Sequence, residues 1–181
     1  REYKWENEKI NALISDIKKQ PKFLGNIILE ETNTRYEIAD GQQRITTCFL
    51  ILVYLYNYYQ GSTMEQQSIS HILKPYGSFI LKNDTIRTYL RENGNRIVLD
   101  ISEVADVYYQ REDFIRAYTA IRDALSFIRT PAEARDFKNK LLDSEVLVLI
   151  SDHSTSTHIE QIFLDINEKA QLLDVEDIFK G

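Results

Sequence analysis

The sequence is poor in cysteine, long apolar runs and basic charge, and each shortage excludes a class of protein. Its 181 residues include one cysteine, Cys48, which cannot form an internal disulfide and so favours a reducing compartment such as the cytosol. The longest apolar run, 48–56, is far shorter than the roughly 20 residues that cross a bilayer, and no signal-peptide pattern is present. The net charge of −6 argues against broad, non-specific DNA binding by this chain alone. We therefore expect a cytoplasmic protein that does not bind a membrane.

Length and composition are typical of one well-buried globular domain over residues 1–181, without internal repeats. Apolar spacing predicts helices at 7–20, 42–59, 64–73, 109–127, 130–142 and 155–167, and strands at 23–29, 35–39 and 145–150. The first two strands should pair as a hairpin, and the last, apolar on both faces, should be internal. This order predicts an α+β fold in which a small mixed sheet packs with several helices.

Three further local features of the sequence predict structure or function. Gly25, inside the first strand, predicts a bulge or a close approach. Residues 79–81, 85–90 and 96–99 could be short strands, with Asn93-Gly94 favouring a hairpin. Arg87, Arg91 and Arg96 cluster in the same region. They are either a solvated face or a second phosphate-facing patch.

The centre of the sequence is the turn that joins the strand 35–39 to the helix 42–59. Gln42, Gln43 and Arg44 form the first helical turn, where backbone N–H groups have no intrahelical acceptor and the macrodipole is positive. Gly41 permits close approach to the backbone. Such a helix start tends to bind phosphate, and Arg44 adds a two-pronged phosphate donor.

An ordinary turn capped by Asp40 or Gly41 would also explain this stretch. The density of donors favours a ligand site, because two amides, Arg44 and the hydroxyls of Thr46 and Thr47 crowd the positive end of a very hydrophobic helix. Arginine in a first turn also opposes the dipole preference. We therefore interpret Arg44 as serving a ligand.

Other chemistry finds less support in the sequence. The three histidines are too scattered for a zinc site, and Cys48 lies on an apolar stripe, which argues against a catalytic thiol. Mg²⁺ bound with a nucleotide needs only one or two carboxylates. Asp40 is the metal candidate beside the phosphate site, and Asp165 and Asp177 are further carboxylates.

The string Asp-Gly-Gln-Gln-Arg-Ile-Thr-Thr at 40–47 resembles the signature of the N-terminal domain of GmrSD-type, modification-dependent restriction enzymes. That domain is similar to the ParB/sulfiredoxin-like fold. Residues 1–5 resemble the end of the family's opening Q-R-x-Y-x-W motif. Residues 162–180 resemble its closing I-F-x-x-(I/L)-N … L … D-(I/L)-x-K pattern, although 168–170 departs from the glycine that often follows the asparagine. The sequence between 60 and 145 carries no matching motif.

The resemblance implies a nucleotide-binding domain excised from a longer chain, in a phage-defence protein whose C-terminal nuclease domain cleaves DNA. We expect a Mg²⁺-dependent nucleoside triphosphatase in which Gly41, Gln42, Gln43 and Arg44 hold phosphate oxygens. Gln42 or Gln43 would orient a water, and Asp40 would hold the metal or accept a proton. Thr46, Thr47 and Asn167 complete the nucleotide-binding set, although Asn167 could instead end its helix.

Two other functions stay open. One is a module that binds a nucleotide or DNA without hydrolysis, as ParB-like relatives suggest. The other is a domain that nicks DNA itself, which the acidic balance and the lack of a dense carboxylate–lysine site disfavour. Phosphate release by the purified protein would separate hydrolysis from simple binding.

Overall fold

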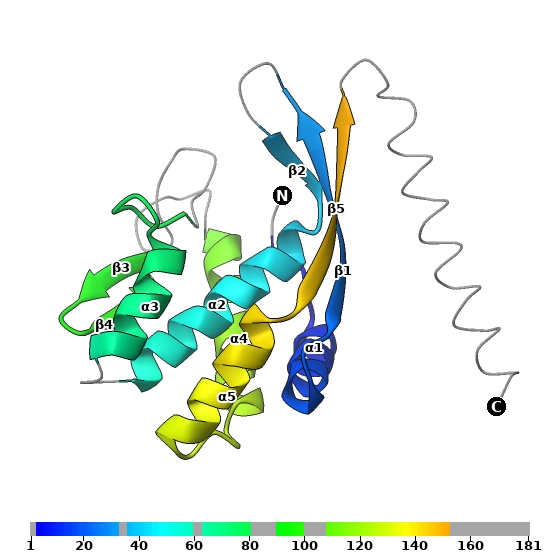
Figure 1. Cartoon of the computed structure of the whole chain (residues 1–181). Helices are drawn as coiled ribbons and strands as arrows, with labels where there is room; N and C mark the ends of the chain where they lie inside the picture. Colours follow the sequence, from blue (N-terminus) through cyan, green and yellow to red (C-terminus); the bar gives the residue numbers. More distant parts are fainter. Residues whose placement is uncertain (1–2, 33–35, 60–62, 81–89, 100–107, 153–181) are drawn as a thin grey trace, which may run out of the picture. The chain divides into compact units, whose positions relative to one another are not determined.

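The computed structural model describes residues 3–32, 36–59, 63–80, 90–99 and 108–152. The expected helix 155–167 and the residues Asp165, Asn167 and Asp177 lie outside this part. The described elements are α1 (Asn7–Lys19), β1 (Phe23–Glu31), β2 (Tyr36–Asp40), α2 (Gln42–Tyr58), α3 (Thr63–Leu73), β3 (Leu90–Asn93), β4 (Arg96–Leu99), α4 (Tyr108–Ala124), α5 (Pro131–Leu142) and β5 (Glu145–Asp152) (Figure 1). The fold is therefore α+β, as the sequence predicts.

The chain divides into two compact units. The first comprises Arg1–Gly25 and Gln42–Val146, and the second comprises Asn26–Gly41 and Leu147–Gly181. The chain passes from the first unit to the second within β1, returns at the start of α2, and leaves again within β5. The first turn of α2 therefore belongs to the first unit, whereas Asp40 and Gly41 belong to the second.

The larger sheet has the strand order β2-β1-β5, with β1 in the middle. β1 and β2 form the predicted antiparallel hairpin, with Leu29 opposite Ile38 and a register shift between Ile28 and Leu29. β1 and β5 point the same way in Figure 1, so the sheet is mixed.

The prediction that 145–150 is an internal strand is wrong for the described sheet, because β5 forms one of its edges. The strand is apolar on both faces. Apolar composition shows that its side chains favour burial, but it does not determine which element packs against them. Val148 and Ile150 keep 45% and 57% of their surface exposed.

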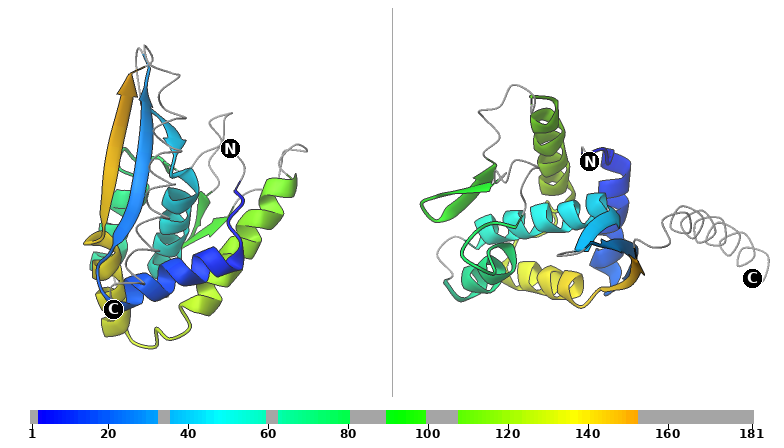
Figure 2. Two further views of the ribbon diagram at one scale, coloured as in Figure 1. Left: turned by 90° about the vertical axis from the view of Figure 1, so that its right-hand side faces the viewer. Right: turned by 90° about the horizontal axis from the view of Figure 1, so that it is seen from above.

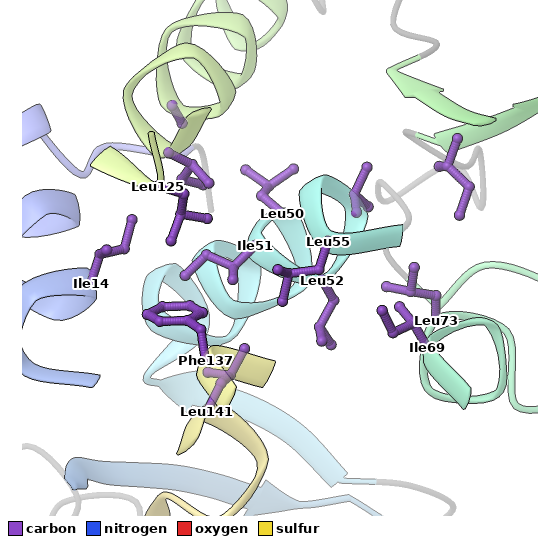
Figure 3. Close-up of a cluster of buried hydrophobic side chains, with 14 of the residues drawn as sticks. Ile14, Leu50, Ile51, Leu52, Leu55, Ile69, Leu73, Leu125, Phe137 and Leu141 are labelled. Carbon is purple, nitrogen blue, oxygen red and sulfur yellow. The ribbon is translucent and has the colours of Figure 1, made fainter. Parts of the chain in front are cut away.

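Helix α2 is the centre of the first unit. It packs against α3, α4, α5 and β4, and α1 packs against α4 and α5; Figure 2 shows these helices arranged around α2. The core joins α2 to side chains from its neighbours, including Ile14, Ile69, Leu125 and Phe137 (Figure 3). The predicted burial of this helix is confirmed.

The buried side chains of α2 differ in detail from the predicted stripe. Leu50, Ile51 and Leu55 are fully buried, whereas Cys48 and Phe49 are half-buried and pack against the core. The helix is apolar around most of its circumference, so its sequence gives no sharp periodicity from which to choose the deepest face.

Helix boundaries follow local chemistry. Thr130 caps α5 with a complete capping box to Glu133, and Pro131 stands at the first helical turn, as predicted. Helix α1 ends at Lys19, and Pro21 follows it closely.

The structure differs from two predictions for the region after α3. Phe79 and Ile80 do not form a strand, because the Ile80 N–H donates to the Leu73 carbonyl oxygen at 3.1 Å and folds this loop onto the end of α3. The other residues of the expected strands 79–81 and 85–90, except Leu90, lie outside the described part of the chain. β3 and β4 form the expected hairpin, but its two turn residues are Gly94-Asn95.

A buried ion cluster joins α3 to α5. Glu65 is 8% exposed, and its carboxylate accepts hydrogen bonds from the Lys138 ammonium and, at 2.7 Å, from Arg135 Nε. These two hydrogen bonds hold the pKa of Glu65 below its ordinary value. Burial, reinforced by the Glu65 charge, raises the pKa of nearby Tyr59 to about 12.

Candidate functional site

The candidate site begins at the first turn of α2, residues Gln42–Arg44. This turn contains no acidic side chain, and the N–H groups of a first helical turn have no acceptor within the helix. The local charge is therefore positive from both the dipole and Arg44. An anion is the ligand that such a turn favours.

Arg44 lies against Gly25 of β1. A Cβ atom built on Gly25 would lie 3.0 Å from Arg44 Nη2, 3.1 Å from Cζ and 3.2 Å from Nη1. Gly25 also has φ +96°, a conformation that side-chain-bearing residues rarely adopt. The close approach predicted at Gly25 is thus an approach of the Arg44 guanidinium, and glycine is the residue that leaves space for it.

Asp40 and Gly41 are described with the second unit. Asp40 ends β2 opposite Ile28, and Gly41 has φ +92°. A Cβ on Gly41 would lie 3.1 Å from Ile27 Cγ1 and 3.3 Å from the Asn26 carbonyl oxygen. Gly41 is therefore required for the turn itself, because the backbone of β1 passes beside it.

The segment Tyr3–Trp5 holds the first turn of α2. The Lys4 N–H donates to Gln43 Oε1 at 2.6 Å, and the Tyr3 hydroxyl lies 2.8 Å from Thr47 Oγ1. Thr47 in turn donates to the Gln43 carbonyl oxygen at 2.8 Å. These bonds fix Gln43 from two directions, so its side-chain oxygen already has a structural partner.

Thr46 and Thr47 are both buried, at 7% and 0% exposure. We therefore assign Thr47 to the frame that supports the turn. Tyr3 belongs to the same frame, and burial raises the pKa of its hydroxyl.

Arg116 of α4 secures the segment Tyr3–Trp5 from its other end. Its Nη1 donates to the Trp5 carbonyl oxygen at 3.0 Å and to Asn7 Oδ1 at 3.2 Å, and its Nη2 pairs with Asp113 at 3.2 Å. The segment Tyr3–Trp5 is thus fixed to α2 by Lys4 and to α4 by Arg116.

Cys48 follows the site on α2 without the features of a nucleophile. Burial raises the pKa of its thiol to about 11, although the positive charge of Arg44 acts in the opposite direction. A thiol with that pKa is almost wholly protonated at neutral pH. This agrees with the expectation that Cys48 is not catalytic.

The remaining candidates are dispersed. Arg91 and Arg96 are exposed on the β3–β4 hairpin, and Arg87 lies outside the described residues. Within the described part of the chain, no group of three or more His, Cys, Asp or Glu side chains is placed to hold a metal ion. An open groove of about 410 Å³ between α1 and α4, lined by residues such as Ser15 and Asp123, includes none of the predicted site residues.

Sequence reasoning missed the residues that position the turn. The hydrogen bond between Lys4 and Gln43 joins residues 39 apart, and that between Arg116 and Trp5 joins residues 111 apart. No local pattern reports contacts at such separations. Tyr3 and Trp5 carried one signal, their place in the opening motif.

The arrangement defines a class of protein: an α+β domain whose central buried helix starts at a glycine turn and presents an arginine there. A family model described as the GmrSD restriction endonuclease, N-terminal domain, matches residues 1–181, and the chain belongs to that family. No curated protein and no solved structure matches it. Family membership gives the chain a role in DNA restriction, a defence against phage. Among the described helices, none is both long and apolar enough to cross a membrane.

Proposed function

We propose that this domain binds a nucleoside triphosphate at the first turn of α2 and hydrolyses it with Mg²⁺, thereby regulating DNA cleavage by a nuclease domain of the full-length protein. The observation that carries the proposal is the position of Arg44. Arg44 is half-buried, and its guanidinium stands against Gly25 at the positive end of a buried helix. A bound phosphate offsets the unfavourable interaction of a cation with this end of the helix.

The residues present fit a phosphate group. The amides of Gln42–Arg44 and the guanidinium of Arg44 are donors, and the first turn brings no carboxylate that would repel an anion. Asp40 precedes α2 by two residues and supplies a carboxylate, and Mg²⁺ needs few protein ligands when phosphate oxygens complete its shell. When bound, the metal neutralises charge on the phosphates.

The hydrogen bonds of the site divide the roles of the two glutamines. Because Gln43 Oε1 accepts from the Lys4 N–H, Gln43 supports the turn, and the task of orienting water falls to Gln42. Tyr3 and Thr47 hold the backbone of the turn in place. Asp40 accepts the proton of the attacking water or holds the metal.

The test combines phosphate release with nucleotide binding. Each nucleoside triphosphate is offered with Mg²⁺ to the purified protein, and phosphate release is compared with a no-enzyme control. Arg44→Ala should weaken binding by about 1.5–3 kcal/mol, the scale of hydrogen bonds to a charged group. Arg44→Lys should restore only part of this loss, because an ammonium cannot make the two-pronged contact.

Two matched arginine variants make the outcome specific. Arg122→Ala removes an exposed arginine of α4 that pairs with its neighbour Asp123, and it should leave binding unchanged. Arg96→Ala tests the hairpin patch. Binding that survives Arg44→Ala but is lost with Arg96→Ala would move the site to the β3–β4 hairpin. Binding without phosphate release would instead favour a module that uses the nucleotide only as a signal.

A further inference from the structure

Among the described strands, β5 is an apolar strand at the edge of its sheet. It forms one end of the order β2-β1-β5, and Leu147, Val148 and Ile150 are 50%, 45% and 57% exposed. Val146, Val148 and Ile150 alternate along the strand and so share one face. Proteins protect such edges with lysine, proline, a bulge or a covering segment. No lysine or proline stands within β5, and a covering segment is one of the remaining ways to protect it.

The chain supplies a suitable segment directly after β5. Residues 153–181 follow the strand in sequence and lie outside the described part. Within them Ile159, Ile162, Phe163 and Ile166 have the spacing of one helical face. By the same periodicity, Gln161 falls on the opposite side.

We propose that the apolar side chains of 159–166 cover the exposed face of β5 formed by Val146, Val148 and Ile150. The short connection between β5 and residues 159–166 favours this segment over a second copy of the chain as the cover. Only a few residues separate Asp152 from Ile159, so the segment is present at an effective concentration in the millimolar range. A helical segment that follows a strand typically buries its apolar stripe on the sheet it leaves.

Disulfide trapping in the full chain tests the contact. Val148→Cys is combined with Ile162→Cys, and the matched control combines Val148→Cys with Gln161→Cys. Under a mild oxidant and at low protein concentration, the first pair should form an intramolecular disulfide at least roughly tenfold faster than the control, because only the first is held at contact distance. The native Cys48, whose pKa burial raises to about 11, reacts too slowly to compete.

A labelling experiment gives a second readout with single cysteines. In Val148→Cys protein, Phe163→Lys should speed reaction of the new thiol with a maleimide several-fold, and Gln161→Lys should not. Equal cross-linking of the two cysteine pairs, or equal labelling of the two lysine variants, overturns the proposal. Disulfides between chains that increase with protein concentration also overturn it, in favour of a second copy as the cover.

Discussion

Replacing Gly25 with alanine perturbs the candidate site without substituting any of the predicted site residues. The new methyl group would meet Arg44 Nη2 at 3.0 Å and Cζ at 3.1 Å. Those atoms end a flexible side chain, so the guanidinium can move away, but it then leaves its position at the start of α2. Gly77→Ala is the matched control, because Gly77 also has positive φ, +78°, with nothing within 4 Å of a built Cβ.

The two substitutions should have similar costs in stability and different costs in binding. A non-glycine residue held at positive φ costs about 1–3 kcal/mol of folding free energy, which both variants share. Only Gly25→Ala displaces Arg44, so only this variant should lose up to about 1.5–3 kcal/mol of nucleotide binding, roughly a 10- to 150-fold weaker affinity.

Denaturant titration and nucleotide titration on the same variants provide the measurement. The double variant Gly25→Ala/Arg44→Ala completes a thermodynamic cycle for unfolding, and a coupling of at least about 0.5 kcal/mol is expected for groups in contact. Unchanged affinity in Gly25→Ala would refute the placement of Arg44 at the ligand. Additive unfolding free energies would refute the contact between Gly25 and Arg44.

Three further predictions concern the stability of the first unit, which includes the first turn of α2. Leu55→Ala, at a fully buried position of α2, should lower the free energy of unfolding by about 2–5 kcal/mol in urea titration, and a loss under about 1 kcal/mol would contradict the core position. Glu65→Gln should cost about 3–5 kcal/mol because it leaves the Lys138 ammonium buried without its anion. The folded pKa of Glu65 is lowered, so its stabilisation is complete above the unfolded pKa and is lost as pH falls through the folded value; urea titrations from pH 7 to pH 3 should show that loss in wild type and a smaller one in the variant. Tyr3→Phe should cost about 0.5–1.5 kcal/mol by removing the hydroxyl beside Thr47, and a thermal melt unchanged from wild type would show that this bond does not hold the turn.

The sequence by itself determined most of the helices and strands and the family. Periodicity placed α1, α2, α3, α5 and the β1–β2 hairpin within a residue or two, because spacing of 3.6 or 2 and the cap at Thr130 are local properties. The run 40–47 pointed to the family, which the family match confirms. The ligand, the metal and their residues stay predictions.

Tertiary structure alone decided which residues meet. It placed Arg44 against Gly25, committed Gln43 to Lys4, and buried Thr47 beside Tyr3. It also placed β5 at the edge of the described sheet, where composition had suggested an internal strand. Each of these is a contact between distant parts of the chain. The pattern around a residue reports how much apolar surface it brings, whereas only the folded chain determines which partner covers that surface.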